Sequence, residues 1–456
     1  MMGSGVARVW VGVFAVSAMA VVSPVAVAAP VVSGPVVGAS EAEQRAALEE
    51  QMRVAAAAKR GVARELSWWI TGLGVDRSLT VSKGAGVKVC VIDSGVDATH
   101  QDLVGVRFEG GTDVSGQGAP DGLKPQTEHG TGMAAFIAGR GSGPGRSQGI
   151  IGAAPDATIM SVSSLVGLAT PQEVMGKAMS YCVAQGAKVI SISQAGGLNP
   201  SKTRALIEAQ EKDVVVVVAA GNDRQADRWG WRQAFGALQV GGVTADLQIH
   251  PDSNRGIQKK DGLVYGQGNG VCGPYAVKVG EPIPGASPTG GYTKHGGGTS
   301  AATAVVSGVV AAVRSKYPEL SAGQVIRRVL ATAKRNGGGP VPDEQCGWGV
   351  VDAYAAVTAD VPVGDKENPL GKLREGDTAR GRPSNTASMG EWDRSYKPTY
   401  NLQEELAAWE AEKEAKAESV KRREQLKMAG VAVVAVAGVF GGVFWWRRRR
   451  GVGRQG

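Results

Sequence analysis

Short apolar runs separated by helix-like segments are the feature that most constrains the fold of this chain. The clearest runs are Val87–Ile92, Val189–Ser193 and Val214–Ala220. A strand buried on both faces is apolar along nearly its whole length, and parallel strands need a long, usually helical, connection. The pattern over residues 66–358 therefore predicts an α/β domain with a mostly parallel central sheet covered by helices on both faces. Ligands of such folds bind beyond the carboxyl ends of the strands.

The first residues have the pattern of a secretory signal peptide. Arg8 precedes an apolar stretch over residues 9–22, and a small-x-small sequence follows at residues 26–28. A basic start, a short apolar centre and small residues at the exit are typical of export signals. We predict a signal peptide over residues 1–29, cleaved at or one residue before its end. An uncleaved anchor is the alternative.

The C-terminal region predicts a single membrane-spanning helix. Met428–Trp446 contains no charged residue, and a helix of that length spans ~29 Å, close to the ~30 Å hydrocarbon core of a bilayer. Arg447–Arg450 follow at once, and such clusters stay on the cytoplasmic side. We predict a transmembrane helix over residues 428–446 and a basic cytoplasmic tail over 447–456. The protein would then be a single-pass protein of the cell membrane, with the folded domain extracellular.

Two polar segments connect the domain to these ends. Residues 30–65 form an N-terminal extension with a helix-prone stretch, which either packs on the domain or is a pro-segment that is removed. Residues 359–427 begin with Pro, Gly and charged residues and continue with a run rich in Glu, Ala and Lys. Pairs of opposite charge four residues apart stabilise helices. We interpret this segment as a linker and charged stalk, with a disordered tether as the alternative.

The charge distribution argues against binding to nucleic acid. The formal net charge is +8 at pH 7, and Arg447–Arg450 with Arg454 supply five positive charges at the C-terminus. The rest of the chain is close to neutral. A nucleic-acid-binding domain would need Lys and Arg gathered on one folded face. We therefore expect no nucleic acid among the partners.

Four polar residues stand at the ends of the apolar runs or at the start of helical segments. Asp93 ends the first run, and Asn222 follows the valine run. His129 lies in a Gly- and Thr-rich segment before the expected helix 133–139. Ser300 follows two glycines and Thr299, before the expected helix 303–316. Each residue alone has an ordinary structural explanation as a turn or a helix cap.

Together these residue types suit nucleophilic catalysis. A serine hydroxyl is a poor nucleophile until a base accepts its proton, and a histidine is the side chain suited to that task near neutral pH. A buried carboxylate fixes the histidine tautomer and stabilises the imidazolium. A side-chain amide can donate to the oxyanion of the tetrahedral intermediate. A serine at the start of a helix adds its own N–H group and a favourable dipole.

In this order and with these neighbours, the residues resemble the subtilisin family, in which the triad runs Asp, His, Ser. The layout of the whole chain is similar to that of the mycosins, membrane-anchored subtilases associated with type VII secretion in mycobacteria and related actinobacteria. The resemblance implies a subtilisin-like three-layer peptidase domain over residues 66–358. It also implies a polypeptide substrate, a type VII secretion membrane complex as a partner, and no cofactor.

The resemblance also assigns site residues. Asp93, His129 and Ser300 correspond to the catalytic triad, and Asn222 to the oxyanion donor. Five residues correspond to the walls of the substrate cleft: Ser193, Gln194, Ala195, Ala220 and Gly221. Two of them depart from the family pattern, since Gln194 stands where Leu is usual and Ala195 where Gly is usual. We expect this added bulk to narrow the cleft or to change the preferred side chain.

Metal and cysteine chemistry are the remaining questions. The stretch from Arg140 to Gln148 is similar in position to the calcium loop of the family, but it holds no carboxylate, so we predict no calcium there and no metal elsewhere. No cysteine pair has CxxC spacing. Cys90, inside an apolar run, is interpreted as a small buried side chain. Cys272 and Cys346 lie in Gly-rich segments, where a disulfide and two free thiols fit equally well.

Two functions of different class remain open. One is an active endopeptidase that cleaves exported polypeptide at the cell surface. The other is a mainly structural subunit that stabilises a membrane secretion complex. The predicted anchor, the stalk and the altered cleft favour this second function. A lipase or esterase is disfavoured, because Ser300 is followed by two alanines and has no Gly-x-Ser-x-Gly elbow.

Overall fold

The computed structural model describes residues 61–165, 169–224, 234–255, 258–260, 263–265, 268–288, 290–335 and 341–373, with a few residues between 411 and 422. The predicted signal peptide, the transmembrane segment 428–446 and the basic tail lie outside the described residues, as does most of the N-terminal extension. Within the described ranges, no helix is both long and apolar enough to cross a bilayer.

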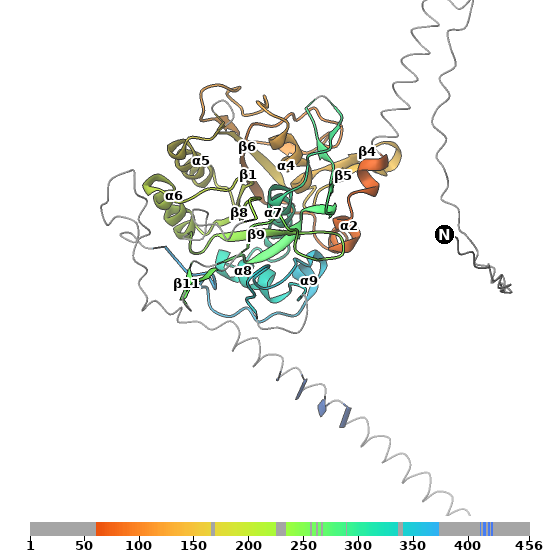
Figure 1. The fold of residues 1–456 in the computed structure, drawn as a ribbon, viewed down its shortest axis with the longest axis vertical. Helices are drawn as coiled ribbons and strands as arrows, with labels where there is room; N and C mark the ends of the chain where they lie inside the picture. Colours follow the sequence, from red (N-terminus) through yellow and green to blue (C-terminus); the bar gives the residue numbers. More distant parts are fainter. Residues whose placement is uncertain are drawn as a thin grey trace, which may run out of the picture. The chain divides into compact units, whose positions relative to one another are not determined.

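An eight-stranded parallel sheet forms the centre of the domain (Figure 1). From one edge to the other its strands are β12 (Val271–Pro274), β9 (Leu238–Val243), β8 (Val215–Ala219), β7 (Val189–Ile192), β1 (Lys88–Asp93), β6 (Thr158–Ser163) and β2 (Arg107–Phe108), and β3 (Thr112–Asp113) also pairs with β6. The strands that come after β1 in the sequence lie on both sides of β1 in the sheet. The strand order therefore reverses at β1, where α/β folds bind their ligands.

Helices cover both faces of the sheet, as the alternation of side chains along each strand requires. Val89 and Val91 of β1 pack into one core with α4 (His129–Ala138), α7 (Thr299–Lys316), α8 (Ala322–Ala331) and α9 (Ala353–Thr358). Cys90 and Ile92 pack into a second core with α5 (Gln172–Ala184) and α6 (Pro200–Glu211), which lie together on the other side in Figure 1. The predicted three-layer α/β architecture is confirmed.

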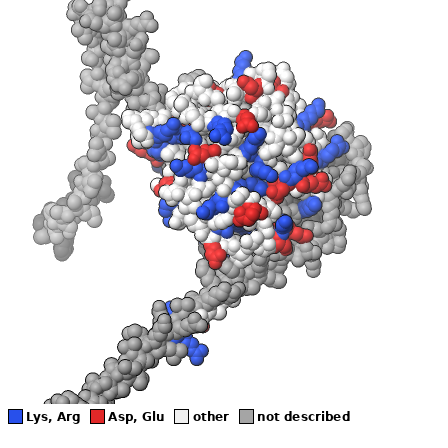
Figure 2. All heavy atoms as spheres, turned by 180° about the vertical axis from the view of Figure 1, so that it is seen from behind, with Lys and Arg blue, Asp and Glu red and all other residues white. Residues whose placement is uncertain are grey.

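Short elements complete the domain. They are α2 (Trp69–Gly72), α3 (Val75–Ser78), the 3-10 helix η1 (Pro144–Arg146) and the strand pairs β4 (Arg140–Ser142) with β5 (Gln148–Ile151), β10 (Gln258–Lys260) with β11 (Leu263–Tyr265), β13 (Ala276–Lys278) with β14 (Glu281–Pro282), and β15 (Gly285–Ala286) with β16 (Tyr292–Thr293). On the face drawn in Figure 2, Lys and Arg side chains are interspersed with Asp and Glu.

Two disulfides join distant parts of the domain. Cys272 on β12 is bonded to Cys346, which is one of the two states that the sequence left open. Cys90 on β1 is bonded to Cys182 on α5. The interpretation of Cys90 as a plain buried side chain was therefore incomplete. It is fully buried, but its neighbour across the sheet–helix contact is a second cysteine.

The packed domain reaches beyond residues 66 and 358 at both ends. Ala63 is buried on the N-terminal side. On the C-terminal side, the guanidinium of the buried Arg327 donates to the carbonyl oxygens of Val363 and Asp365 at 2.8 and 2.9 Å. Leu373 is buried as well. The last residues of the predicted extension and the first of the predicted linker thus belong to the folded unit.

Arg64 fastens the N-terminal end to η1 and to the start of β5. Its Nε donates to the Gly149 carbonyl oxygen at 2.7 Å, and its Nη2 donates to those of Gln148 and Arg146 at 2.9 and 3.1 Å. The buried carboxylate of Asp102 adds a favourable electrostatic interaction. A tethered guanidinium thus binds carbonyl oxygens in, and directly after, the stretch for which the sequence predicts no calcium.

Replacing Arg64 is expected to destabilise the domain. Hydrogen bonds to a charged group contribute more than neutral ones, and Arg64→Ala leaves three carbonyl oxygens and Asp102 without their cation. We expect a loss of about 2–4 kcal/mol in the free energy of unfolding, measured by urea denaturation. Arg107→Ala, at an exposed position of β2, is the control and should change stability by less than about 0.5 kcal/mol. Equal stability of the two variants would contradict this role.

Candidate active site

The site lies where three neighbouring strands end. Val91 of β1 pairs with Ser191 of β7, so the register continues to Asp93 beside Ser193. Ile192 of β7 pairs with Val218 of β8. The turn after β8 therefore lies beside the end of β7, on the side away from β1. Adjacent strands are ~4.8 Å apart. The polar residues that follow these three strands therefore lie at one edge of the sheet, at the point where the strand order reverses.

Asp93 and His129 form a hydrogen-bonded pair. The ring Nδ1 of His129 lies 2.8 and 2.9 Å from the two carboxylate oxygens of Asp93. The Asp93 side chain is 2% exposed, and that of His129 is 37% exposed. A carboxylate can only accept a hydrogen bond, so Nδ1 carries a proton and the neutral ring keeps Nε2 as an acceptor. The ring is thereby prepared to take a proton from a hydroxyl.

The start of α4 places the histidine against β1. The helix begins at His129 itself, four residues before the helix start expected from the sequence. The hydroxyl of Ser94 accepts from the Gly130 N–H at 3.0 Å and donates to the Thr127 carbonyl oxygen at 3.1 Å. A Cβ on Gly130 would lie 2.3 Å from the Gly95 carbonyl oxygen. Only glycine therefore lets the helix approach the strand so closely.

The surroundings of His129 raise its pKa above the ordinary value of 6.5. Burial disfavours the charged imidazolium and acts to lower the pKa. The carboxylate of Asp93, through its charge and its hydrogen bond, acts in the opposite direction, and the charge of Glu128 adds to it. The net effect is upward, because a nearby negative charge stabilises the protonated ring.

Ser300 is the second residue of α7 and is tied to the end of β7. Its Oγ donates to the Ser193 carbonyl oxygen at 2.8 Å, and the Ser193 Oγ donates back to the Ser300 carbonyl oxygen at 3.0 Å. In the described part of the chain no hydrogen bond joins Ser300 to His129. Rotation about the Cα–Cβ bond, between staggered positions, would release the hydroxyl from Ser193 without backbone movement.

Asn222 is oriented by a residue that sequence reasoning missed. Its Oδ1 accepts from both the backbone N–H and the hydroxyl of Thr299, each at 3.0 Å. The amide nitrogen Nδ2 therefore faces the other way, as a donor. The Thr299 Oγ1 also accepts from the Gly221 N–H at 3.1 Å. Because N–H groups in the first turn of a helix have no partner within it, the Ser300 N–H supplies a second donor beside Nδ2.

The predicted cleft residues lie on two segments that flank the start of α7. Ser193, Gln194 and Ala195 follow β7, and Ala220 and Gly221 follow β8. The first segment is fastened to α7 by the paired bonds between Ser193 and Ser300, and the second by the bond from Gly221 to Thr299. Ser94 and Thr299 lie inside the sequence motifs, but the sequence assigns neither a role, because a hydroxyl beside a glycine is common in loops.

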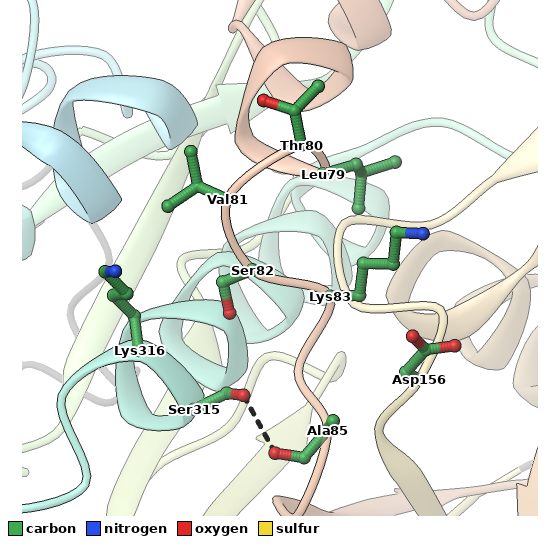
Figure 3. A pocket seen from close by; sticks show the side chains of 9 residues that line it. All are labelled: Leu79, Thr80, Val81, Ser82, Lys83, Ala85, Asp156, Ser315 and Lys316. Carbon is green, nitrogen blue, oxygen red and sulfur yellow. Dashed lines mark hydrogen bonds between the residues drawn. The ribbon is translucent and has the colours of Figure 1, made fainter.

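A separate hollow lies at the opposite end of α7 (Figure 3). It has a volume of about 340 Å³ and is lined by Leu79, Thr80, Val81, Ser82, Lys83, Ala85, Asp156, Ser315 and Lys316. Ser315 comes fifteen residues after Ser300, ~22 Å along the helix. The hollow is therefore not part of the site. Among the side chains that the structure describes, no group of three or more His, Cys, Asp or Glu is arranged to hold a metal ion.

Comparison with known proteins identifies the family. The model of the subtilase family, peptidase family S8, matches residues 84–349. The chain belongs to the subtilase family. It is a subtilisin-type serine peptidase, and the matched residues include the Asp93–His129 pair, Asn222 and Ser300.

The relatives of this subtilase include mycosins. The chain is 33% identical to Mycosin-1 of Mycobacterium tuberculosis over 361 residues, which cover 67% of this chain and 76% of that protein. The crystal structure of MycP1 from the ESX-1 type VII secretion system matches with a TM-score of 0.55 at 28% identity, covering 67% of this chain and 88% of that one. A second MycP1 structure, described as an essential component of the type VII (ESX-1) secretion system, matches with a TM-score of 0.51 at 29% identity and covers 64% and 88%.

The pKa of His129 predicts the acid side of the activity profile. We expect His129 to act as a general base, which works only when neutral, so activity should fall as the pH drops through the pKa of its ring. Because this pKa is raised, the acid limb of kcat/KM should have its midpoint above pH 6.5. Glu128→Gln removes one of the charges that raise the pKa and should move the limb to lower pH. A midpoint below 6.5, or a Glu128→Gln shift to higher pH, would contradict this electrostatic account.

Proposed function

We propose that this subtilase is an endopeptidase of the outer cell surface that cleaves exported polypeptides, with Asp93, His129 and Ser300 as its catalytic triad. The observation that carries the proposal is the Asp93–His129 hydrogen bond at the end of β1. This bond lies next to the end of β7, where the Ser300 hydroxyl donates to the Ser193 carbonyl oxygen. The order of these residues in the sequence matches the family to which the chain belongs.

The chemistry follows from the roles that the geometry allows. His129 Nε2 accepts the Ser300 proton as Oγ attacks the scissile carbonyl carbon, and Asp93 stabilises the imidazolium. The negative oxygen of the tetrahedral intermediate accepts hydrogen bonds from Asn222 Nδ2 and the Ser300 N–H. His129 then gives its proton to the leaving amine. Water, deprotonated by the same ring, releases the acyl group and restores the Ser300 hydroxyl.

The substrate backbone would bind as an added strand. The segment that follows β7 presents backbone groups next to Ser300, and an extended peptide can pair with such an edge. Backbone pairing aligns the scissile bond without reading side chains. The segment after β8 forms the opposite wall. Both walls are hydrogen-bonded to the first turn of α7. The same turn therefore positions the cleft walls and the proposed catalytic groups.

Export and anchoring follow from the two ends of the chain. The predicted signal peptide, residues 1–29, would send the domain across the membrane, and the helix 428–446 with its basic tail would hold it there, with the C-terminus in the cytoplasm. The similarity to MycP1 of a type VII secretion system supports association with a type VII membrane complex. Exported proteins that pass this complex are the proposed substrates.

A mainly structural role in such a complex is the second candidate. One relative is described as an essential component of its secretion system. A protein that only cleaves substrates need not be a component of the system itself. In this case the folded domain would stabilise the complex and cleavage would be dispensable. Secretion in a strain that carries only the Ser300→Ala variant separates the two roles.

Ser300→Ala tests the proposal most simply. Intact cells are treated with a membrane-impermeant fluorophosphonate probe, and hydrolysis of added peptide is followed in parallel. Wild-type protein should be labelled at Ser300 and the variant should not, with hydrolysis reduced by at least about 10⁴-fold because the nucleophile is gone. Ser315→Ala, at the far end of the same helix, should behave like the wild type.

Three outcomes count against parts of the proposal. Labelling that persists in Ser300→Ala would rule out Ser300 as the nucleophile. Labelling that requires cell lysis would contradict the outward orientation. Full secretion with Ser300→Ala and none in a deletion strain would favour the structural role.

A further inference from the structure

The segment that carries Asn222 belongs to no helix or strand. It follows β8 over residues 220–224, and Gly221 within it has φ +108°, a conformation that glycine adopts readily. Thr299 binds the Asn222 side chain and the Gly221 N–H. A turn outside regular secondary structure keeps one shape only when its other backbone N–H and C=O groups also find partners.

The buried residue Asn254 supplies partners on both sides of Asn222. Its Nδ2 donates to the Ala220 carbonyl oxygen at 3.1 Å, and its Oδ1 accepts from the Asp223 N–H at 2.9 Å. Its backbone N–H donates to the Gly221 carbonyl oxygen at 2.9 Å. One residue from a distant part of the chain therefore pairs with backbone groups that come before Asn222 and with one that comes after it.

The amide group of Asn254 suits this position because the turn needs a donor and an acceptor from one short side chain. An asparagine amide provides both without a charge, whereas an ionised carboxylate only accepts and an aliphatic side chain does neither. The contact is also close. A Cβ on Gly221 would lie 2.4 Å from Asn254 Nδ2, so the glycine is required for the amide to reach the turn.

Asn254 is itself held by buried polar side chains. Its carbonyl oxygen accepts from Asn269 Nδ2 at 3.2 Å and from the Ser253 hydroxyl at 3.3 Å. Asn269 Nδ2 also donates to the Gln345 carbonyl oxygen at 2.7 Å, and Asn269 Oδ1 accepts from Nε2 of Gln239 on β9 at 2.9 Å. Breaking such buried hydrogen bonds is costly. Asn254 is thus fixed to the strand next to β8 and offers the turn a rigid support.

We propose, on the basis of the proposed function, that Asn254 is a positioning residue that holds Asn222 ready to bind the oxyanion. Thr299 sets the orientation of the Asn222 side chain, and Asn254 sets the backbone that carries it. A hydrogen-bond donor lowers the barrier most when it is in place before the negative charge develops. Loss of the Asn254 amide should therefore slow the chemical step and leave substrate binding nearly unchanged.

The first test is the hydrolysis of a peptide p-nitroanilide by the full-length protein in detergent. In Asn254→Ala, kcat should fall at least about 10-fold, approaching the roughly 10²–10³-fold loss caused by removing an oxyanion donor. KM should change less than about 3-fold, because an interaction made in the transition state is lost.

Asn368→Ala is the matched control. Asn368 Nδ2 likewise donates to a carbonyl oxygen, that of Gly236, at 2.8 Å, and its Oδ1 accepts from the Leu370 N–H at 2.9 Å. Gly236 precedes β9, so this amide lies toward the end of the parallel strands that is remote from the site. Its kcat and KM should stay within about 3-fold of the wild type. An equal loss of kcat in both variants would contradict a specific role of Asn254.

A double-mutant cycle with Asn222 separates positioning from general support of the fold. If Asn254 acts through the Asn222 amide, its replacement should matter little once that amide is gone. Asn254→Ala should then lower kcat less than about 3-fold in an Asn222→Ala background, because coupled residues are not additive. A loss as large as in the wild-type background would overturn the proposal, and so would an unchanged kcat in Asn254→Ala alone.

Hydrogen exchange of the wild-type protein decides the matter if Asn254→Ala does not fold. Asp223 is exposed, yet its N–H should exchange at least about 100-fold more slowly than an unprotected amide, because it donates to a buried side chain. Exchange at the unprotected rate would overturn the proposal.

Failure of the proposed function gives a different result. If Ser300 of the wild type does not react with a fluorophosphonate, both the proposed activity and the role of Asn254 are wrong. If Ser300 reacts but no peptide is cleaved, the rate constants of that reaction replace kcat in the double-mutant cycle. If the wild type is active and the cycle is additive, the peptidase assignment stands and the role of Asn254 is wrong.

Discussion

The parallel register of β1, β7 and β8 is the constraint on which the site depends. It makes three strands end level with one another, so that Asp93, Ser193 and the turn leading to Asn222 share one edge. Side chains alternate between the faces of a sheet, and Asp93 falls on the same face as Val91, which α4 and α7 cover. A shift of one residue would turn the acid toward α5 and away from His129. The buried apolar strands that fix the register therefore also fix the position of Asp93 against His129.

The first turn of α7 is the second support of the site. Gly298, at φ +92°, allows the sharp entry into the helix, and a Cβ there would lie 3.2 Å from the Asn222 amide. Thr299 orients that amide, and Ser300 is bonded to Ser193. Three successive residues thus connect the helix to two strand ends. Because the positive end of the helix dipole lies here as well, the same turn favours negative charge on a substrate oxygen.

The fold and the four proposed catalytic residues could be predicted from the sequence, because long apolar runs and family motifs are local signals. Helix starts at His129 and Thr299 were missed, since glycine-rich segments are normally assigned to loops. The bond between Cys90 and Cys182 was missed because a cysteine inside an apolar strand looks like any small buried residue. The role of Thr299 depends on a contact across 77 positions of the chain. Such contacts are set by the tertiary structure, and a single sequence does not display them.

The most direct measurement of the central claim is a crystal structure of the protein inactivated by a peptidyl phosphonate. The account predicts a covalent bond to Ser300 Oγ, with the phosphonyl oxygen within hydrogen-bonding distance of Asn222 Nδ2 and the Ser300 N–H, and with the His129 ring still bonded to Asp93. An adduct on another residue would contradict the account. So would a phosphonyl oxygen pointing into solvent with Asn222 turned away, because the three strand ends would then not converge on one reacting carbon.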